Sequence, residues 1–211
     1  MPLPRVQPII PISGKEPFDD PDWLFDFKYD GFRALLYLEQ GSGRFLSRNG
    51  NTLTRFDALA RAMAAELEVT EAIFDGEVIV ADETGRPLFY DLLRHSGRPA
   101  YVAFDLLWLK RYRLALPASQ RASDAFTTHS ASGIIRCIRG TLRRKSGTRA
   151  LRAMRSHDLE GIVAKRLADP YQPRTSWFKI KNPNYTQKEG RGELLNKRKS
   201  RAVKIMGSDS G

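Results

Sequence analysis

The 211-residue sequence has little cysteine and no long apolar segment. Its single cysteine, Cys137, excludes a disulfide within the chain and is typical of a reducing cytoplasm. No segment approaches the roughly 20 apolar residues that span a bilayer, so we expect no membrane association. The first residues lack the apolar run of a signal peptide, and no internal repeat is evident. These absences favour a cytoplasmic globular protein.

Charge is distributed unevenly along the chain. Residues 1–110 hold 12 basic and 17 acidic side chains, a net −5, whereas residues 111–211 hold 23 basic and 7 acidic ones, a net +16. A basic half of this size attracts phosphate-rich partners through counterion release, without specifying a sequence. The hydrophobic content of 41% indicates a folded core.

The apolar pattern predicts many strands and few helices. We expect an extended, proline-rich lead-in over 1–20 and a basic, disordered tail over 196–211. Apolar residues at helical spacing predict a helix over 54–68 and a short helix over 87–94. Alternating or continuous apolar residues predict strands at 23–29, 33–39, 43–48, 72–80, 101–109, 161–164 and 177–181.

Residues 111–157 interrupt this pattern. They hold ten Arg and one Lys against one Asp, with no clean period of 2 or 3.6 residues. We interpret residues 111–150 as an aberrant Arg-rich segment within one domain that spans 21–195. The segment is either a divergent basic insert or the product of two compensating frameshifts in the gene record.

The stretch from Trp23 to Arg33 carries the strongest chemical signal. The period of a strand places Asp26, Lys28 and Asp30 on one face. A lysine between two carboxylates is either an ion pair on a solvated face or a lysine nucleophile, and the choice depends on the remaining motifs.

Further polar groups occur where strands would otherwise be apolar. Asp75 and Glu77 share a strand face, and Arg48 lies beside a turn. Each has an ordinary structural interpretation, such as a turn arginine or a solvated charge. The residues of this kind outside the lysine stretch are Arg48, Asp75, Glu77, Glu160, Lys179 and Lys181.

Together these residue types suit nucleotidyl transfer from a nucleoside triphosphate. A deprotonated lysine amine attacks the α-phosphorus and holds the nucleotide as a phosphoramidate. A free lysine has a pKa of about 10.4, so cations, a metal or desolvation must favour the neutral amine. Glu77 and Glu160 are candidate Mg²⁺ ligands, Lys179 and Lys181 neutralise phosphate charge, and Phe104 is a candidate base-stacking ring.

The order of these motifs resembles the covalent nucleotidyltransferase superfamily. Within it, the chain is similar to the adenylation domain of ATP-dependent DNA ligases, especially the bacterial end-joining type. The motifs are Lys-Tyr-Asp-Gly-Phe-Arg at 28–33, Ser-Arg-Asn-Gly at 47–50, Asp-Gly-Glu at 75–77, Val-Ala-Phe-Asp-Leu-Leu at 102–107, Glu-Gly-Ile-Val-Ala-Lys at 160–165 and Trp-Phe-Lys-Ile-Lys at 177–181.

The resemblance implies an α+β, ATP-grasp-like nucleotidyltransferase fold, with antiparallel-rich sheets, flanking helices and the nucleotide between two sheets. It implies Lys28 as the adenylated nucleophile, and leaves the role of Asp26 near the adenine open. The implied metal ligands are Glu77 and Glu160. The implied ATP-binding residues are Asp30, Arg33, Arg48, Glu77, Phe104, Lys165, Lys179 and Lys181.

The implied reaction is enzyme adenylation, AMP transfer to a 5′-phosphate and attack by a 3′-hydroxyl, with ATP and Mg²⁺ or Mn²⁺. The implied partners are nicked or broken duplex DNA and end-joining or repair proteins. About 30 residues follow Lys181, too few for the OB-fold that usually completes such ligases, so we expect no C-terminal OB-fold. The alternatives are an RNA ligase or capping-type enzyme, and an inactive remnant that binds DNA.

Overall fold

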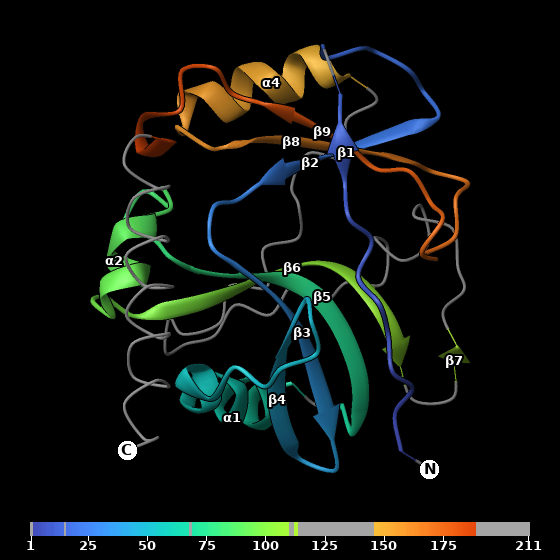
Figure 1. The fold of residues 1–211 in the computed structure, drawn as a ribbon, viewed down its shortest axis with the longest axis vertical. Helices are drawn as coiled ribbons and strands as arrows, with labels where there is room; N and C mark the ends of the chain where they lie inside the picture. Colours follow the sequence, from blue (N-terminus) through green and yellow to red (C-terminus); the bar gives the residue numbers. More distant parts are fainter. Residues whose placement is uncertain (1, 15, 68, 110–111, 114–145, 189–211) are drawn as a thin grey trace, which may run out of the picture.

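The computed structural model describes residues 2–14, 16–67, 69–109, 112–113 and 146–188. These residues form two β-sheets with helices on their outer sides (Figure 1). The strands are β1 (Ile12–Ser13), β2 (Trp23–Lys28), β3 (Phe32–Glu39), β4 (Ser42–Ser47), β5 (Glu71–Val80), β6 (Pro99–Leu109), β7 (Tyr112–Arg113), β8 (Gly161–Arg166) and β9 (Phe178–Lys181). The helices are α1 (Asp57–Glu66), α2 (Phe89–Arg94) and α4 (Gly147–Ser156), with 3₁₀ turns at Thr54–Phe56 and Thr186–Lys188.

One sheet has four strands in the order β1-β9-β8-β2, and the other has five in the order β4-β3-β5-β6-β7. Every neighbouring pair is antiparallel except β1 and β9, which are parallel. In Figure 1, α4 lies above the four-stranded sheet and α1 below the five-stranded sheet, so the inner faces of the sheets look toward each other. This arrangement confirms the expected α+β class with antiparallel-rich sheets and flanking helices.

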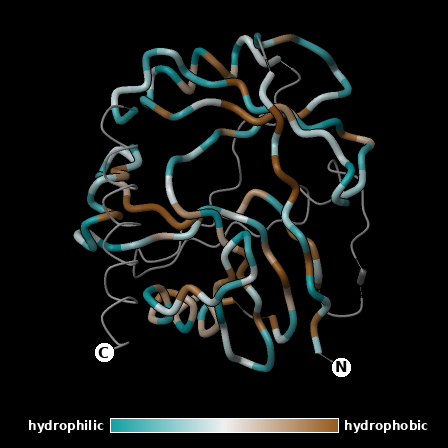
Figure 2. The backbone as a smooth tube through the Cα atoms, in the orientation of Figure 1, coloured by the Kyte–Doolittle hydropathy of each residue, from teal (hydrophilic) through white to brown (hydrophobic). Residues whose placement is uncertain are grey.

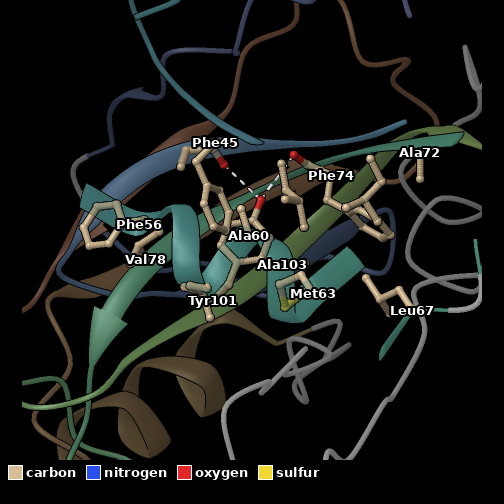
Figure 3. Close-up of a cluster of buried hydrophobic side chains, with 14 of the residues drawn as sticks. Phe45, Phe56, Ala60, Met63, Leu67, Ala72, Phe74, Val78, Tyr101 and Ala103 are labelled. Carbon is tan, nitrogen blue, oxygen red and sulfur yellow. Dashed lines mark hydrogen bonds between the residues drawn. The ribbon is translucent and has the colours of Figure 1, made fainter. Parts of the chain in front are cut away.

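The main core lies between α1 and the five-stranded sheet (Figure 3). Three apolar residues at helical spacing on α1, Leu59, Ala60 and Met63, are buried there, and Ala64 is partly buried against them. Tyr101 enters the same core, and its hydroxyl donates to the carbonyls of Ala34 and Phe74 at 2.9 and 3.2 Å. The buried phenol is therefore satisfied, and it ties β6 to β3 and β5.

A second core lies between α4 and the four-stranded sheet. The Ser146 hydroxyl accepts from the Arg149 N–H at 3.3 Å and so caps the first turn of α4. The buried face of α4 consists of Gly147, Ala150 and Met154, while Arg149 and its neighbouring arginines are exposed. A side chain at Gly147 would meet the Phe18 carbonyl at 2.4 Å, so the helix needs glycine there.

The sequence predicted no helix over 147–156, and that expectation was wrong. The apolar signal of α4 was hidden because two of its three buried positions are glycine and alanine, which carry little hydrophobicity. The predicted strands and the helices over 54–68 and 87–94 are confirmed with small shifts of their ends. Figure 2 shows hydrophobic residues following the strands of both sheets.

The lead-in is extended, as expected, and runs along both sheets before it joins β9 through β1 (Figure 1). Most of the Arg-rich segment, residues 114–145, and the predicted tail over 196–211 lie outside the described residues. The described residues contain no OB-fold barrel beside the two sheets. No helix among them is long and apolar enough to cross a membrane.

Candidate active site

A cleft of about 610 Å³ lies between the two sheets, within the range of roughly 300–1,000 Å³ typical of ligand sites. Both sheets, the lead-in and the turn after β4 contribute to its wall. Seven of the ten predicted site residues line it, namely Lys28, Arg33, Arg48, Glu77, Phe104, Lys165 and Lys179. The fold therefore brings together residues that are up to 151 positions apart, from Lys28 to Lys179.

Lys28 ends β2 and is paired in register with Gly161 at the start of β8. This pairing brings Glu160, the residue just before β8, against the lysine. The two atoms Lys28 Nζ and Glu160 Oε2 are 2.5 Å apart. Glu160 does not line the cleft wall itself, but it contacts the predicted nucleophile directly.

Glu77 approaches the lysine from the other sheet. It lies on β5 opposite Arg33 and lines the cleft. The pKa of the Glu77 carboxyl is raised to about 7, mainly because burial disfavours its charged form; the charge of Glu160 adds to this rise, whereas Lys28 and Arg33 oppose it. Lys28 therefore interacts with a carboxylate from each sheet.

These two glutamates are the basis for testing whether a metal fits the site. The described residues contain no group of three or more His, Cys, Asp or Glu side chains suited to a metal ion. Magnesium is commonly held by only one or two carboxylates together with substrate phosphates and water. Glu77 and Glu160 beside Lys28 fit such a shared site, in which the nucleotide supplies the remaining oxygens.

Lys165, a predicted ATP-binding residue, forms ion pairs with carboxylates of the protein itself. Its ammonium is 2.7 Å from Asp26 and 3.2 Å from Asp105, and it lies 4.2 Å from the centre of the Trp177 ring. Burial lowers the pKa of Lys165, but the two carboxylates outweigh it and raise the value above the usual one. Lys165 thus joins β8 to β2 and β6 at the floor of the cleft.

Arg33 also has protein partners. Its guanidinium donates through Nε and Nη2 to the two oxygens of Asp75, at 3.0 and 2.6 Å, and through Nη1 to the Ile9 carbonyl at 2.6 Å. It lies 5.4 Å from the centre of the Phe104 ring. The resemblance implies that Arg33 binds ATP, and in the structure its guanidinium is bound to Asp75 at the cleft wall.

The other predicted residues occupy different parts of the site. Phe104 lines the cleft, and its ring meets that of Trp177 edge to face, at 75° with centroids 6.4 Å apart. Lys181 is exposed at the end of β9 and does not line the cleft. Asp30 is buried after β2 and accepts a hydrogen bond from the Tyr185 hydroxyl at 2.7 Å.

Sequence reasoning missed several partners of these residues. Asp105 was detectable, since an acid inside the apolar run of β6 requires a buried cation. Tyr171 gave no such signal, because it lies in an irregular stretch between β8 and β9. It nonetheless donates to Asp75 at 2.7 Å and lies beside Trp177.

Comparison with known proteins gives matches over most of this chain. A family model described as "ATP dependent DNA ligase domain" matches residues 13–181. The multifunctional non-homologous end joining DNA repair protein LigD of Mycobacterium tuberculosis is 34% identical over 169 residues, which are 77% of this chain and 22% of that protein. The chain therefore spans about a fifth of the length of this curated relative.

Two solved structures share the fold. The crystal structure of the ligase domain of M. tuberculosis LigD has a TM-score of 0.70 and 29% identity, and the match covers 83% of this chain and 59% of that one. Mycobacterial DNA ligase D complexed with ATP and MES has a TM-score of 0.70 and 28% identity, with 83% and 60% covered.

Proposed function

This chain belongs to the ATP-dependent DNA ligase family and is an adenylation domain of that family, and on this basis we propose that Lys28 accepts an adenylyl group from ATP. The observation that carries the proposal is that Lys28 and Glu77 line one cleft of nucleotide size and that Glu160 contacts Lys28 directly. The mycobacterial ligase D structure holds ATP, which supports ATP as the substrate here.

In the proposed reaction, the neutral amine of Lys28 attacks the α-phosphorus. A bond forms between Nζ and phosphorus, and the bond from phosphorus to the bridging oxygen breaks, so that pyrophosphate leaves. The ammonium that donates to Glu160 is not nucleophilic, so the lysine must first release a proton to solvent water and leave this ion pair. Lys179 and Arg48, which line the cleft, supply positive charge for the phosphates.

Glu77 and Glu160 are proposed to hold Mg²⁺ or Mn²⁺ together with the triphosphate. When bound, the cation supplies positive charge at the phosphate oxygens. Phe104 is proposed to stack on the adenine. Lys181 is proposed to contact phosphate from the rim of the site. Lys165, Arg33 and Asp30 are bound to other side chains of the protein. These contacts favour a structural role for the three residues over direct contact with ATP.

The adenylate is proposed to serve DNA repair. AMP passes from Lys28 to the 5′-phosphate of nicked or broken duplex DNA, and a 3′-hydroxyl then displaces it to seal the strand. LigD is an end-joining repair protein, which supports this substrate and a partnership with end-joining proteins. We propose that this reaction takes place in the cytoplasm, at the nucleoid.

Incubation with α-labelled ATP and Mg²⁺ tests the proposal. Wild type is expected to retain label covalently, and Lys28→Ala is expected to retain none. Lys188→Ala, which removes an exposed lysine outside the cleft, is the matched control and should be labelled like wild type. Labelling by α-labelled GTP but not ATP would instead favour a capping-type enzyme, and no labelling by either would favour an inactive DNA-binding remnant.

A further inference from the structure

The lead-in binds first to one sheet and then to the other. Two of its backbone N–H groups donate to side chains of β3 in the five-stranded sheet, Leu3 to Glu39 at 3.1 Å and Val6 to Tyr37 at 3.1 Å. Two later ones donate to carbonyls at β9 in the four-stranded sheet, Ile12 to Trp177 at 2.8 Å and Gly14 to Lys179 at 2.9 Å. Between these two sets of bonds, the chain crosses the opening between the sheets (Figure 1).

The crossing segment begins at Ile9, whose backbone N–H and carbonyl are both hydrogen-bonded to side chains. Ile9 is 1% exposed, its N–H donates to the Tyr171 hydroxyl at 3.2 Å, and its carbonyl accepts from Arg33 at 2.6 Å. Asp75 in turn accepts from both Arg33 and Tyr171 and so fixes the two groups together. Both polar atoms of the Ile9 backbone are therefore held by side chains, and one of these, Arg33, lines the cleft.

The next two residues, Ile10 and Pro11, line the cleft. Ile10 is 61% exposed, so a large apolar side chain stands at the cavity mouth without being needed for the core. The same Arg33 that clamps Ile9 also lies 5.4 Å from the centre of the Phe104 ring, which lines the same cleft. The clamp thus connects the crossing segment to the ring proposed to stack on adenine.

We propose that Ile10 and Pro11 form an apolar lip that contacts the adenosine part of ATP, and that Arg33, Asp75 and Tyr171 are positioning residues that hold this lip in place. This inference rests on the proposed function, because it takes ATP as the occupant of the cleft. Apolar contact with a nucleoside gains affinity by removing apolar surface from water. The lip is accordingly expected to affect ATP binding and not the rate of lysine attack.

Ile10→Ala and Ile12→Ala form a matched pair that tests the lip. Both isoleucines are exposed, at 61% and 51%, and both lie on the lead-in, but Ile12 does not line the cleft. Ile10→Ala should raise the KM for ATP in self-adenylation about tenfold. The rate at saturating ATP should stay within about twofold of wild type. Ile12→Ala should leave both values unchanged, and equal values for the two variants would overturn the lip.

Tyr171→Phe tests the clamp and preserves the ring packing against Trp177. It removes the hydroxyl that binds Ile9 and Asp75, and should likewise raise the KM for ATP severalfold. Tyr37→Phe is its control, because that hydroxyl binds the lead-in at Val6 and Pro4, farther along the chain from the lip. A similar rise in both variants would mean that any loosening of the lead-in suffices, and would refute the clamp.

A double variant separates positioning from independent effects. If Tyr171 acts through the lip, Tyr171→Phe combined with Ile10→Ala should raise the KM no more than the larger single effect. Multiplied effects would contradict a shared route.

Equilibrium binding of ATP, measured for each lip variant in a Lys28→Ala background, keeps the test separate from the chemistry. The lip fails if binding is unchanged there, whereas the proposed function fails if wild type forms no adenylate.

Discussion

Replacing Lys165 by methionine should destabilise the fold strongly. The substitution leaves the carboxylates of Asp26 and Asp105 buried, at 6% and 4% exposed, without the ammonium that lies 2.7 and 3.2 Å from them. Removing one partner of a buried ion pair costs about 3–5 kcal/mol. Methionine retains most of the apolar packing against Trp177, so the loss is expected to come from charge and not from a cavity.

Urea denaturation followed by circular dichroism measures this loss. The slope of the unfolding free energy against urea concentration should be the same for wild type and variant. The companion variant combines Lys165→Met with Asp26→Asn and Asp105→Asn, which removes the buried charges together and should recover most of the lost free energy of unfolding. A loss below about 1 kcal/mol for Lys165→Met alone would refute the reasoning. The ion pairs of Lys165 with Asp26 and Asp105 would then contribute little to the stability of the fold.

Three further outcomes follow from the same structure. Gly31→Ala should lower the free energy of unfolding by about 1–3 kcal/mol in a thermal melt, because a Cβ there would lie 2.2 Å from the Val78 carbonyl oxygen; an unchanged melt would contradict this close approach. Tyr185→Phe removes the hydrogen bond to buried Asp30 and should cost about 1–2 kcal/mol in urea, and a stability equal to wild type would count against that bond. The folded-state pKa of Lys165 is raised, so its stabilisation is complete below the usual lysine value of 10.5 and is lost as pH rises through the higher folded value. The stability difference between wild type and Lys165→Met should therefore stay constant from about pH 7 to 9 and shrink only above about pH 10.5, and shrinkage at lower pH would contradict the assignment.

Much of the fold could be predicted because its strands carry strong apolar patterns. The sequence predicted strands at 72–80 and 101–109, which are nine of the ten residues of β5 and nine of the eleven residues of β6. The helix α4 could not be found this way, since its buried face is built from Gly147, Ala150 and Met154. The pairing of β1 with β9 was equally hidden, because a two-residue strand has no period to detect.

The candidate site shows a similar division. The motifs indicated that Lys28, Glu77 and Glu160 belong together, and the sheets bring them together. The motifs did not reveal that Arg33 and Lys165 bind carboxylates of the protein itself. Such pairings depend on which strands become neighbours and in which register, and no local pattern encodes that information. The Ile9 clamp is a further case, because its Tyr171 partner is 162 residues away.

The most direct test of the account is the mapping of the modified residue by tandem mass spectrometry after incubation of the wild-type chain with ATP and Mg²⁺. We expect one adenylyl group, attached to the Nζ atom of Lys28. An adenylyl group on any other residue, or none despite saturable ATP binding in the cleft, would contradict it.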